Sequence, residues 1–149
     1  MIATADQQIA AMARVWPDWR VLERDTRFVR WGGPLRPLLQ TYAVEIRYRV
    51  PMLLERQDAA LHQPRVSIAA PALRPRAGDT EGRLPHVYYL DDGSIALCLL
   101  DPDAGDWSAI DLIAETTVPW TIDWLAAYEG WRATGTWTAS GRHVERVNG

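Results

Sequence analysis

Residues 42–50 read Tyr-Ala-Val-Glu-Ile-Arg-Tyr-Arg-Val, and this alternation of apolar and polar side chains decides the fold class. Successive side chains of a strand point to opposite faces, so the charged residues of this stretch share one face and the apolar ones the other. The apolar face carries Tyr42, Val44, Ile46, Tyr48 and Val50. The stretch therefore predicts a half-buried strand of an antiparallel sheet.

Shorter strands are predicted on both sides of this stretch. Residues 21–24 and 27–31 have strand character, and the Gly-Gly-Pro sequence at 32–34 predicts the turn that follows them. After the central strand, residues 65–70 predict another, and the Pro-, Arg- and Gly-rich residues 71–83 favour a loop. Together these segments predict an antiparallel meander of about four strands.

Helices are predicted at both ends of the chain. Residues 4–16 have apolar side chains at helical spacing, and Thr4 and Gln7 form a possible capping box. Residues 107–116 predict a short helix, and Pro119 suits the first turn of a second one. A stripe on that helix, expected to face the protein, consists of Trp120, Trp124, Tyr128 and Trp131. The element order predicts one α+β domain over residues 1–149.

The composition disfavours two classes of function, membrane insertion and nucleic-acid binding. The 149 residues are 48% hydrophobic, and no run approaches the ~18 consecutive apolar residues of a membrane span. The N-terminus has no basic segment followed by an apolar core, so we expect a soluble, cytoplasmic protein without membrane contact. Residues 1–83 hold thirteen arginines and nine acids, but these alternate along the chain, which disfavours nucleic-acid binding.

A single cysteine, Cys98, is the candidate for chemistry. With three histidines in the chain, a Cys-rich zinc site is excluded, and no metal or organic cofactor is expected. The sequence around Cys98 is acidic, and there is no arginine between Arg83 and Arg132. The nearby acids are Asp91, Asp92, Asp101, Asp103 and Asp106. Because carboxylates disfavour a thiolate, we expect a slow attacker of unactivated amides that suits an acyl carrier accepting a thioester.

Residues 84–99, Leu-Pro-His-Val-Tyr-Tyr-Leu-Asp-Asp-Gly-Ser-Ile-Ala-Leu-Cys-Leu, followed by Trp107, carry a resemblance. A histidine in an extended segment, an Asp-Gly turn, a cysteine in an apolar context and then a tryptophan resemble the core of ubiquitin-conjugating (E2) enzymes. The chain is most similar to the short bacterial E2-like family found beside cyclic-oligonucleotide synthases in antiphage (CBASS-type) operons. The further matching motifs are Val118-Pro119-Trp120, Trp124-Leu125, Tyr128-Glu129-Gly130-Trp131, Thr134-Gly135-Thr136-Trp137 and His143.

This resemblance implies a UBC-like fold and a bacterial, cytoplasmic transferase. Cys98 would form a thioester with a C-terminal glycyl group and pass that group to an amine. The implied partners are a cyclic-oligonucleotide synthase (cGAS-like) or a ubiquitin-like protein C-terminus, and an E1-like activator. Eukaryotic E2 enzymes carry His-Pro-Asn where this chain has His86-Val87-Tyr88. His86 is therefore expected to organise the backbone near the site, and Tyr88 or a backbone N–H to replace the asparagine.

Two other functions remain open. The chain could be a catalytically inactive UBC-like binding module, or a hydrolase that pairs Cys98 with His86 or His143. The sequence also contains no lysine, and all sixteen of its basic residues are arginine. A primary amine near a bound thioester has a high effective concentration, so the absence of lysine would prevent the protein from acylating itself.

Overall fold

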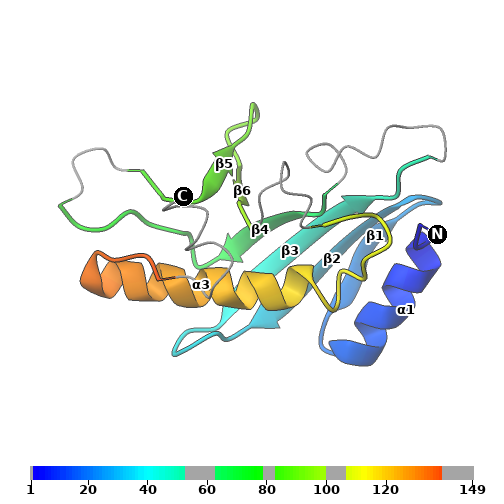
Figure 1. Cartoon of the computed structure of the whole chain (residues 1–149), viewed down its shortest axis with the longest axis horizontal. Helices are drawn as coiled ribbons and strands as arrows, with labels where there is room; N and C mark the ends of the chain where they lie inside the picture. The colour runs from blue at the N-terminus through cyan, green and yellow to red at the C-terminus, as the bar shows by residue number, and fades with distance from the viewer. Residues whose placement is uncertain (1, 53–62, 79–82, 100–106, 139–149) are drawn as a thin grey trace.

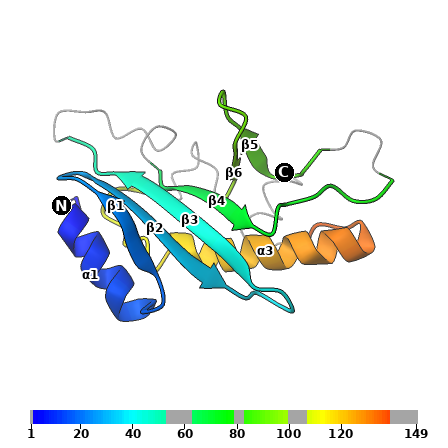
Figure 2. The same cartoon turned by 180° about the vertical axis from the view of Figure 1, so that it is seen from behind.

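The computed structural model describes residues 2–52, 63–78, 83–99 and 107–138, and its α+β class matches the prediction. Helix α1 (Ala5–Val15) lies beside one end of a four-stranded sheet, and helix α3 (Thr117–Thr134) crosses one face of that sheet (Figures 1 and 2). The sheet contains β1 (Arg20–Arg24), β2 (Phe28–Leu35), β3 (Tyr42–Arg49) and β4 (Arg65–Ala70). A separate hairpin consists of β5 (Val87–Tyr89) and β6 (Ile95–Leu97).

The four-stranded meander has the order β1-β2-β3-β4, and all its pairs are antiparallel. Burial alternates along β3 as its sequence predicts, with Val44 and Ile46 almost completely enclosed. Ile46 pairs with Trp31 of β2 and with Val66 of β4, and both of these side chains are also almost completely buried. The apolar face of the sheet therefore forms the core beneath α3.

The prediction of a turn at residues 32–34 is wrong, because β2 continues through them to Leu35. A Cβ atom added to Gly33 would lie 2.2 Å from the Trp19 ring, so the absence of a side chain lets this indole pack against the strand. Trp19 is 6% exposed. The glycine thus serves close packing, and the chain reverses between Leu35 and Tyr42 instead.

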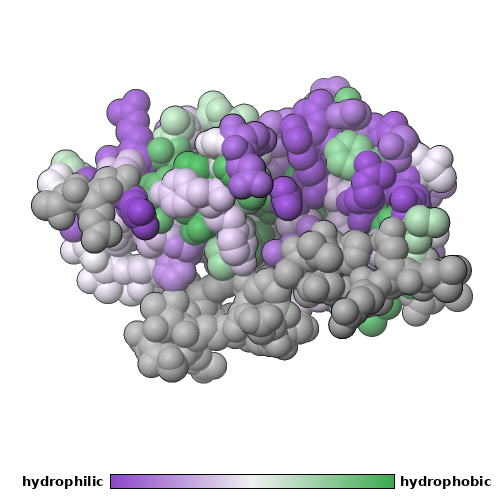
Figure 3. All heavy atoms as spheres, turned by 90° about the horizontal axis from the view of Figure 1, so that it is seen from above, coloured by the Kyte–Doolittle hydropathy of each residue, from purple (hydrophilic) through white to green (hydrophobic). Residues whose placement is uncertain are grey.

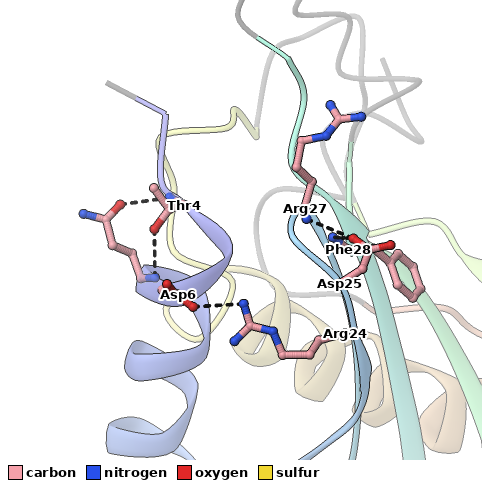
Figure 4. A network of polar contacts seen from close by, with 7 residues as sticks. Thr4, Asp6, Arg24, Asp25, Arg27 and Phe28 are labelled. Atoms are coloured by element: carbon pink, nitrogen blue, oxygen red, sulfur yellow. Dashed lines mark hydrogen bonds and ion pairs between the residues drawn. The ribbon is translucent and has the colours of Figure 1, made fainter.

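Polar contacts cap α1, join it to β1 and close the turn between β1 and β2 (Figure 4). The expected capping box is confirmed, since the Gln7 backbone donates to the Thr4 hydroxyl and the Thr4 backbone to the Gln7 side chain. Asp6 accepts from Arg24 of β1 over 2.9 Å. Between β1 and β2, Asp25 accepts from the backbone N–H groups two and three residues later, and these bonds lower the pKa of its carboxyl.

The helix predicted at residues 107–116 is also wrong, because this segment forms a series of turns. The fully buried side chain of Gln8 explains the difference. Its amide donates to the Asp111 carbonyl and its oxygen accepts from the Ile113 N–H, each over 2.9 Å. A side chain from α1 thereby satisfies backbone groups that a helix would have to bond internally.

Most of the predictions made for helix α3 are confirmed. Pro119 lies in its first turn, and Trp124, Tyr128 and Trp131 of the aromatic stripe are buried, whereas Trp120 is half-buried. The helix ends at Thr134, and the φ of 85° at the following Gly135 lies in the left-handed region typical of a helix end. None of the described helices is long and apolar enough to cross a membrane.

Candidate active site

The β5–β6 hairpin presents the candidate residues and projects from the sheet above β4 (Figure 1). The Asp-Gly sequence forms its turn as predicted, with Gly93 in the left-handed region and the Leu90 N–H bonded to the Ser94 carbonyl. Asp92 accepts from the Ser94 backbone over 2.9 Å and from the Ser94 hydroxyl over 2.5 Å. These bonds, led by the one from the hydroxyl, lower the pKa of Asp92. The turn fixes the register of the two strands.

Cys98 follows β6 directly and is half-buried. Its neighbours Leu97 and Leu99 are each only 5% exposed. The Cys98 N–H donates to the His86 carbonyl over 2.9 Å, which extends the hairpin ladder one step beyond the last strand residue. The cysteine is therefore a partly exposed position held between two buried leucines.

The side chain of Tyr88 lies against Cys98 because of the strand register. Tyr88 pairs with Ala96, so Cys98, two residues further along, is its diagonal neighbour on the same face. The Cys98 thiol donates to the Tyr88 hydroxyl oxygen over 3.4 Å. Tyr88 is 37% exposed, so the structure brings together these two predicted site residues at a surface that other molecules can contact.

His86 contributes to the site through its backbone. Its φ of 54° lies in the left-handed region, and its carbonyl accepts from the Cys98 N–H and from the Trp124 indole, each over 2.9 Å. Its imidazole packs on the Trp137 ring with centroids 4.8 Å apart. Burial lowers the pKa of His86, which favours the neutral imidazole at neutral pH. The backbone of His86 thus contacts Cys98 directly, through the bond between the His86 carbonyl and the Cys98 N–H.

Two tryptophans with a role here were not singled out as site residues by sequence reasoning. Trp124 bonds the His86 carbonyl, and Trp137 contacts both the His86 ring and the Trp124 ring, the latter at 5.1 Å. Trp124 belongs to the aromatic stripe of the second predicted helix, and Trp137 to the Thr-Gly-Thr-Trp motif that matches the family. The residues His143, Asp101, Asp103 and Asp106 lie outside the described residues.

A small hollow lies beside the hairpin, between it and the start of β4. It has a volume of about 280 Å³ and is lined by Tyr88, Ala96 and Arg65, among others. Among the described residues, no group of three or more His, Cys, Asp or Glu side chains is placed to bind a metal ion. Seen from the side of the hairpin, hydrophilic residues predominate toward α1, and hydrophobic ones show between them in the opposite half (Figure 3).

One comparison with known proteins gives a match. The family model described as Type II CBASS E2 protein matches residues 8–144, which include the sheet, the hairpin and α3. A comparison with curated proteins finds no match.

Proposed function

The chain belongs to the family of Type II CBASS E2 proteins, and on that basis we propose that it carries an acyl group as a thioester on Cys98. The acyl group is a C-terminal glycyl group, and the chain passes it to an amine. The observation that carries the proposal is the partly exposed Cys98, fixed between two buried leucines and in contact with a tyrosine hydroxyl.

The proposed reaction has two balanced steps. In the first, the Cys98 sulfur attacks the carbonyl carbon of a donor thioester, the donor thiol leaves with the proton, and a new thioester forms on Cys98. In the second, an amine attacks this carbonyl, the Cys98 sulfur leaves and regains a proton, and an amide remains. Exchange between thioesters is nearly balanced in free energy, so a moderately reactive thiol is sufficient.

Tyr88 and His86 have separate roles in this proposal. The Tyr88 hydroxyl, 3.4 Å from the sulfur, donates a hydrogen bond to the charge that develops at the site, the role that the asparagine has in eukaryotic E2 enzymes. His86 is a positioning residue, because its carbonyl receives the Cys98 N–H and its ring is packed on Trp137.

The wider setting belongs to the same proposal. We propose that residues 1–149 form one UBC-like domain that acts in the bacterial cytoplasm in antiphage defence. The glycyl group comes from the C-terminus of a cyclic-oligonucleotide synthase or of a ubiquitin-like protein, loaded by an E1-like activator where one is present. The four-stranded meander between an N-terminal helix and α3 is compatible with this fold.

A non-reducing gel tests the proposal. Incubation with the synthase and an activating system is expected to give an adduct that a thiol reagent removes. Cys98→Ala abolishes the adduct, and Cys98→Ser gives an ester that resists the thiol reagent. If wild-type protein forms no adduct, or if Cys98→Ala still forms it, the thioester proposal is wrong.

The same variants distinguish the other two functions. A binding module would keep its biological function in Cys98→Ala. A Cys-His hydrolase would react rapidly with iodoacetamide at about pH 6 because its thiolate is already formed. The backbone contact between His86 and Cys98 and the lowered pKa of His86 disfavour the version of that hydrolase that uses His86, since a Cys-His pair needs an imidazolium to stabilise its thiolate.

A further inference from the structure

The end of the molecule opposite α1 carries a hollow that the proposed chemistry does not use. Three segments meet there in both ribbon views: the β2–β3 connection, the loop after β4 and the C-terminal turns of α3 (Figures 1 and 2). The hollow has a volume of about 580 Å³. Its lining includes Leu39, Pro71, Arg74, Glu129 and Arg132.

Apolar side chains are unusually exposed at the rim of this hollow. Leu39 is 87% exposed and its neighbour Leu38 is 53% exposed, both on the β2–β3 connection. Pro71 and Ala133 supply further apolar surface within the hollow. Adjacent leucines open to solvent beside a concave surface are typical of a protein interface, where an apolar centre is surrounded by polar groups.

Arginines determine the charge of this surface. Arg74 and Arg132 line the hollow, and the exposed Arg36 begins the connection that carries the leucines. Within the described parts of the chain, neither Arg74 nor Arg132 makes an ion pair. We use the term arginine face for this surface, which consists of Arg36, Leu38, Leu39, Arg74, Arg132 and the hollow between them.

Among the described residues that line the hollow, Glu129 is the one acid. Glu129 is half-buried, one of its carboxyl oxygens is buried without a hydrogen-bond partner among the described residues, and the Gln40 backbone bonds the carboxyl. Burial raises the pKa of this carboxyl. The described arginine face therefore has three arginines, Arg36, Arg74 and Arg132, against this one carboxyl, and its net formal charge is positive.

The arginine face is connected to the candidate active site by aromatic contacts. Trp131, on the α3 turn between Glu129 and Arg132, contacts the Trp137 ring with centroids 6.4 Å apart. Trp137 packs on His86, whose carbonyl bonds Cys98. A protein that delivers its C-terminal tail to Cys98 must also have its folded part held, and this face lies on the helix that supports the site.

We propose that the arginine face is the docking surface for the folded part of the acyl donor, which presents an acidic segment with apolar side chains. This inference rests on the proposed function for the existence of a donor. The acidic segment lies against the arginines, and its apolar side chains cover Leu38 and Leu39 and enter the hollow. Opposite charges give such a contact its orientation and its fast association.

Binding of the synthase to the Cys98→Ala chain tests the proposal without covalent chemistry. Adding Arg74→Glu and Arg132→Glu is expected to weaken binding about tenfold or more, because two attractive contacts become repulsive. Adding Leu39→Ser instead is expected to weaken it a few-fold through lost apolar burial. The matched control adds Arg14→Glu and Arg20→Glu, two exposed arginines at the α1 end, and is expected to leave binding unchanged.

The substitutions are suited to this test because they spare the fold. Arg74 bonds Tyr128 through its backbone, and Arg132 accepts from Arg76 through its carbonyl, so the altered side chains make no hydrogen bond within the described structure. Thermal unfolding of each variant checks this directly. Equal binding by the two charge-reversed pairs, or no binding of the synthase by the Cys98→Ala chain, would overturn the proposal.

Two further readouts separate the possible results. If binding depends on Arg74 and Arg132 but wild-type protein forms no adduct, the docking surface stands and the thioester proposal fails. An adduct that forms equally well with both reversed pairs supports the thioester and overturns the docking surface. A single-stranded RNA oligonucleotide is the last probe: binding as tight as that of the synthase, lost in the same variant, would identify a general polyanion site and overturn the proposal.

Discussion

The backbone conformation of His86 gives a prediction at the scale of the residue. A φ of 54° is unfavourable for most side chains, least so for Asn, Asp, His and Gly, and costs a β-branched residue about 1–2 kcal/mol. His86→Asn is therefore expected to keep most adduct formation on Cys98, and His86→Val to lose both stability and adduct formation. Thermal unfolding and the non-reducing gel measure the two effects. Equal loss of adduct in both variants, with stability retained, would show that the imidazole itself takes part in the reaction.

The absence of lysine can be tested by introducing one near Cys98. Arg65 lines the hollow beside Tyr88 and Ala96, so an amine at this position would lie near an acyl group on Cys98. Arg65→Lys is expected to acylate itself in the presence of the donor, because proximity gives the amine a high effective concentration. Peptide mass spectrometry should find the glycyl adduct at this position and none in Arg14→Lys, the remote control. No adduct in Arg65→Lys under conditions that load Cys98 contradicts the explanation for the missing lysines.

Within the secondary-structure elements, replacing glycine by alanine is expected to have opposite effects on the free energy of unfolding at two positions. In Gly33→Ala the new methyl group would overlap the Trp19 ring, so we expect a loss of about 1–3 kcal/mol in the free energy of unfolding. In Gly130→Ala, inside α3, nothing lies within 4 Å of the new methyl group, and the better helix propensity should add about 0.5–1 kcal/mol. Denaturant unfolding measures both. A neutral Gly33→Ala would contradict close packing as the reason for this glycine.

The same element shows where prediction from local sequence stops. Gly-Gly-Pro is typical of a turn, and the sequence contains no sign that Trp19, fourteen residues before Gly33, requires the space above the strand. The segment 107–116 fails for a related reason, since its backbone is bonded by Gln8, about a hundred residues away in sequence. By contrast, β3 and the capping box of α1 depend on alternation and on neighbours three residues apart, and both are as predicted. Local sequence patterns are sufficient to predict an element when its residues contact sequence neighbours or need only an apolar environment.

Across the whole molecule, the candidate site combines contacts between residues near in sequence with contacts between distant ones. Tyr88 contacts Cys98 because the hairpin loop has three residues, 91–93, and so pairs Tyr88 with Ala96. A two-residue Asp-Gly turn would pair Tyr88 with Leu97 instead, so the dipeptide alone does not give this register. The contacts of Trp124 and Trp137 with His86 join α3 and the residues after it to the hairpin across 38 and 51 positions, and no periodicity encodes such a pairing. The chemistry of the site is thus local in sequence, and its support comes from the tertiary packing of α3.

Glu129 links the packing of α3 to the stability of the whole chain. Its folded-state pKa is raised by burial, so the unfolded chain ionises more readily and stability decreases as pH rises from the unfolded-state value through the folded one. Glu129→Gln removes the buried charge, and we expect a higher melting temperature than wild type at pH 7 and no gain at about pH 4, where the carboxyl is largely protonated. The exposed Glu115→Gln, from a loose 4.0 Å pair with Arg14, is the control and should change stability by less than about 0.5 kcal/mol at either pH. A gain for Glu129→Gln that is the same at both pH values would show that its effect comes from packing and not from the charge of this carboxyl.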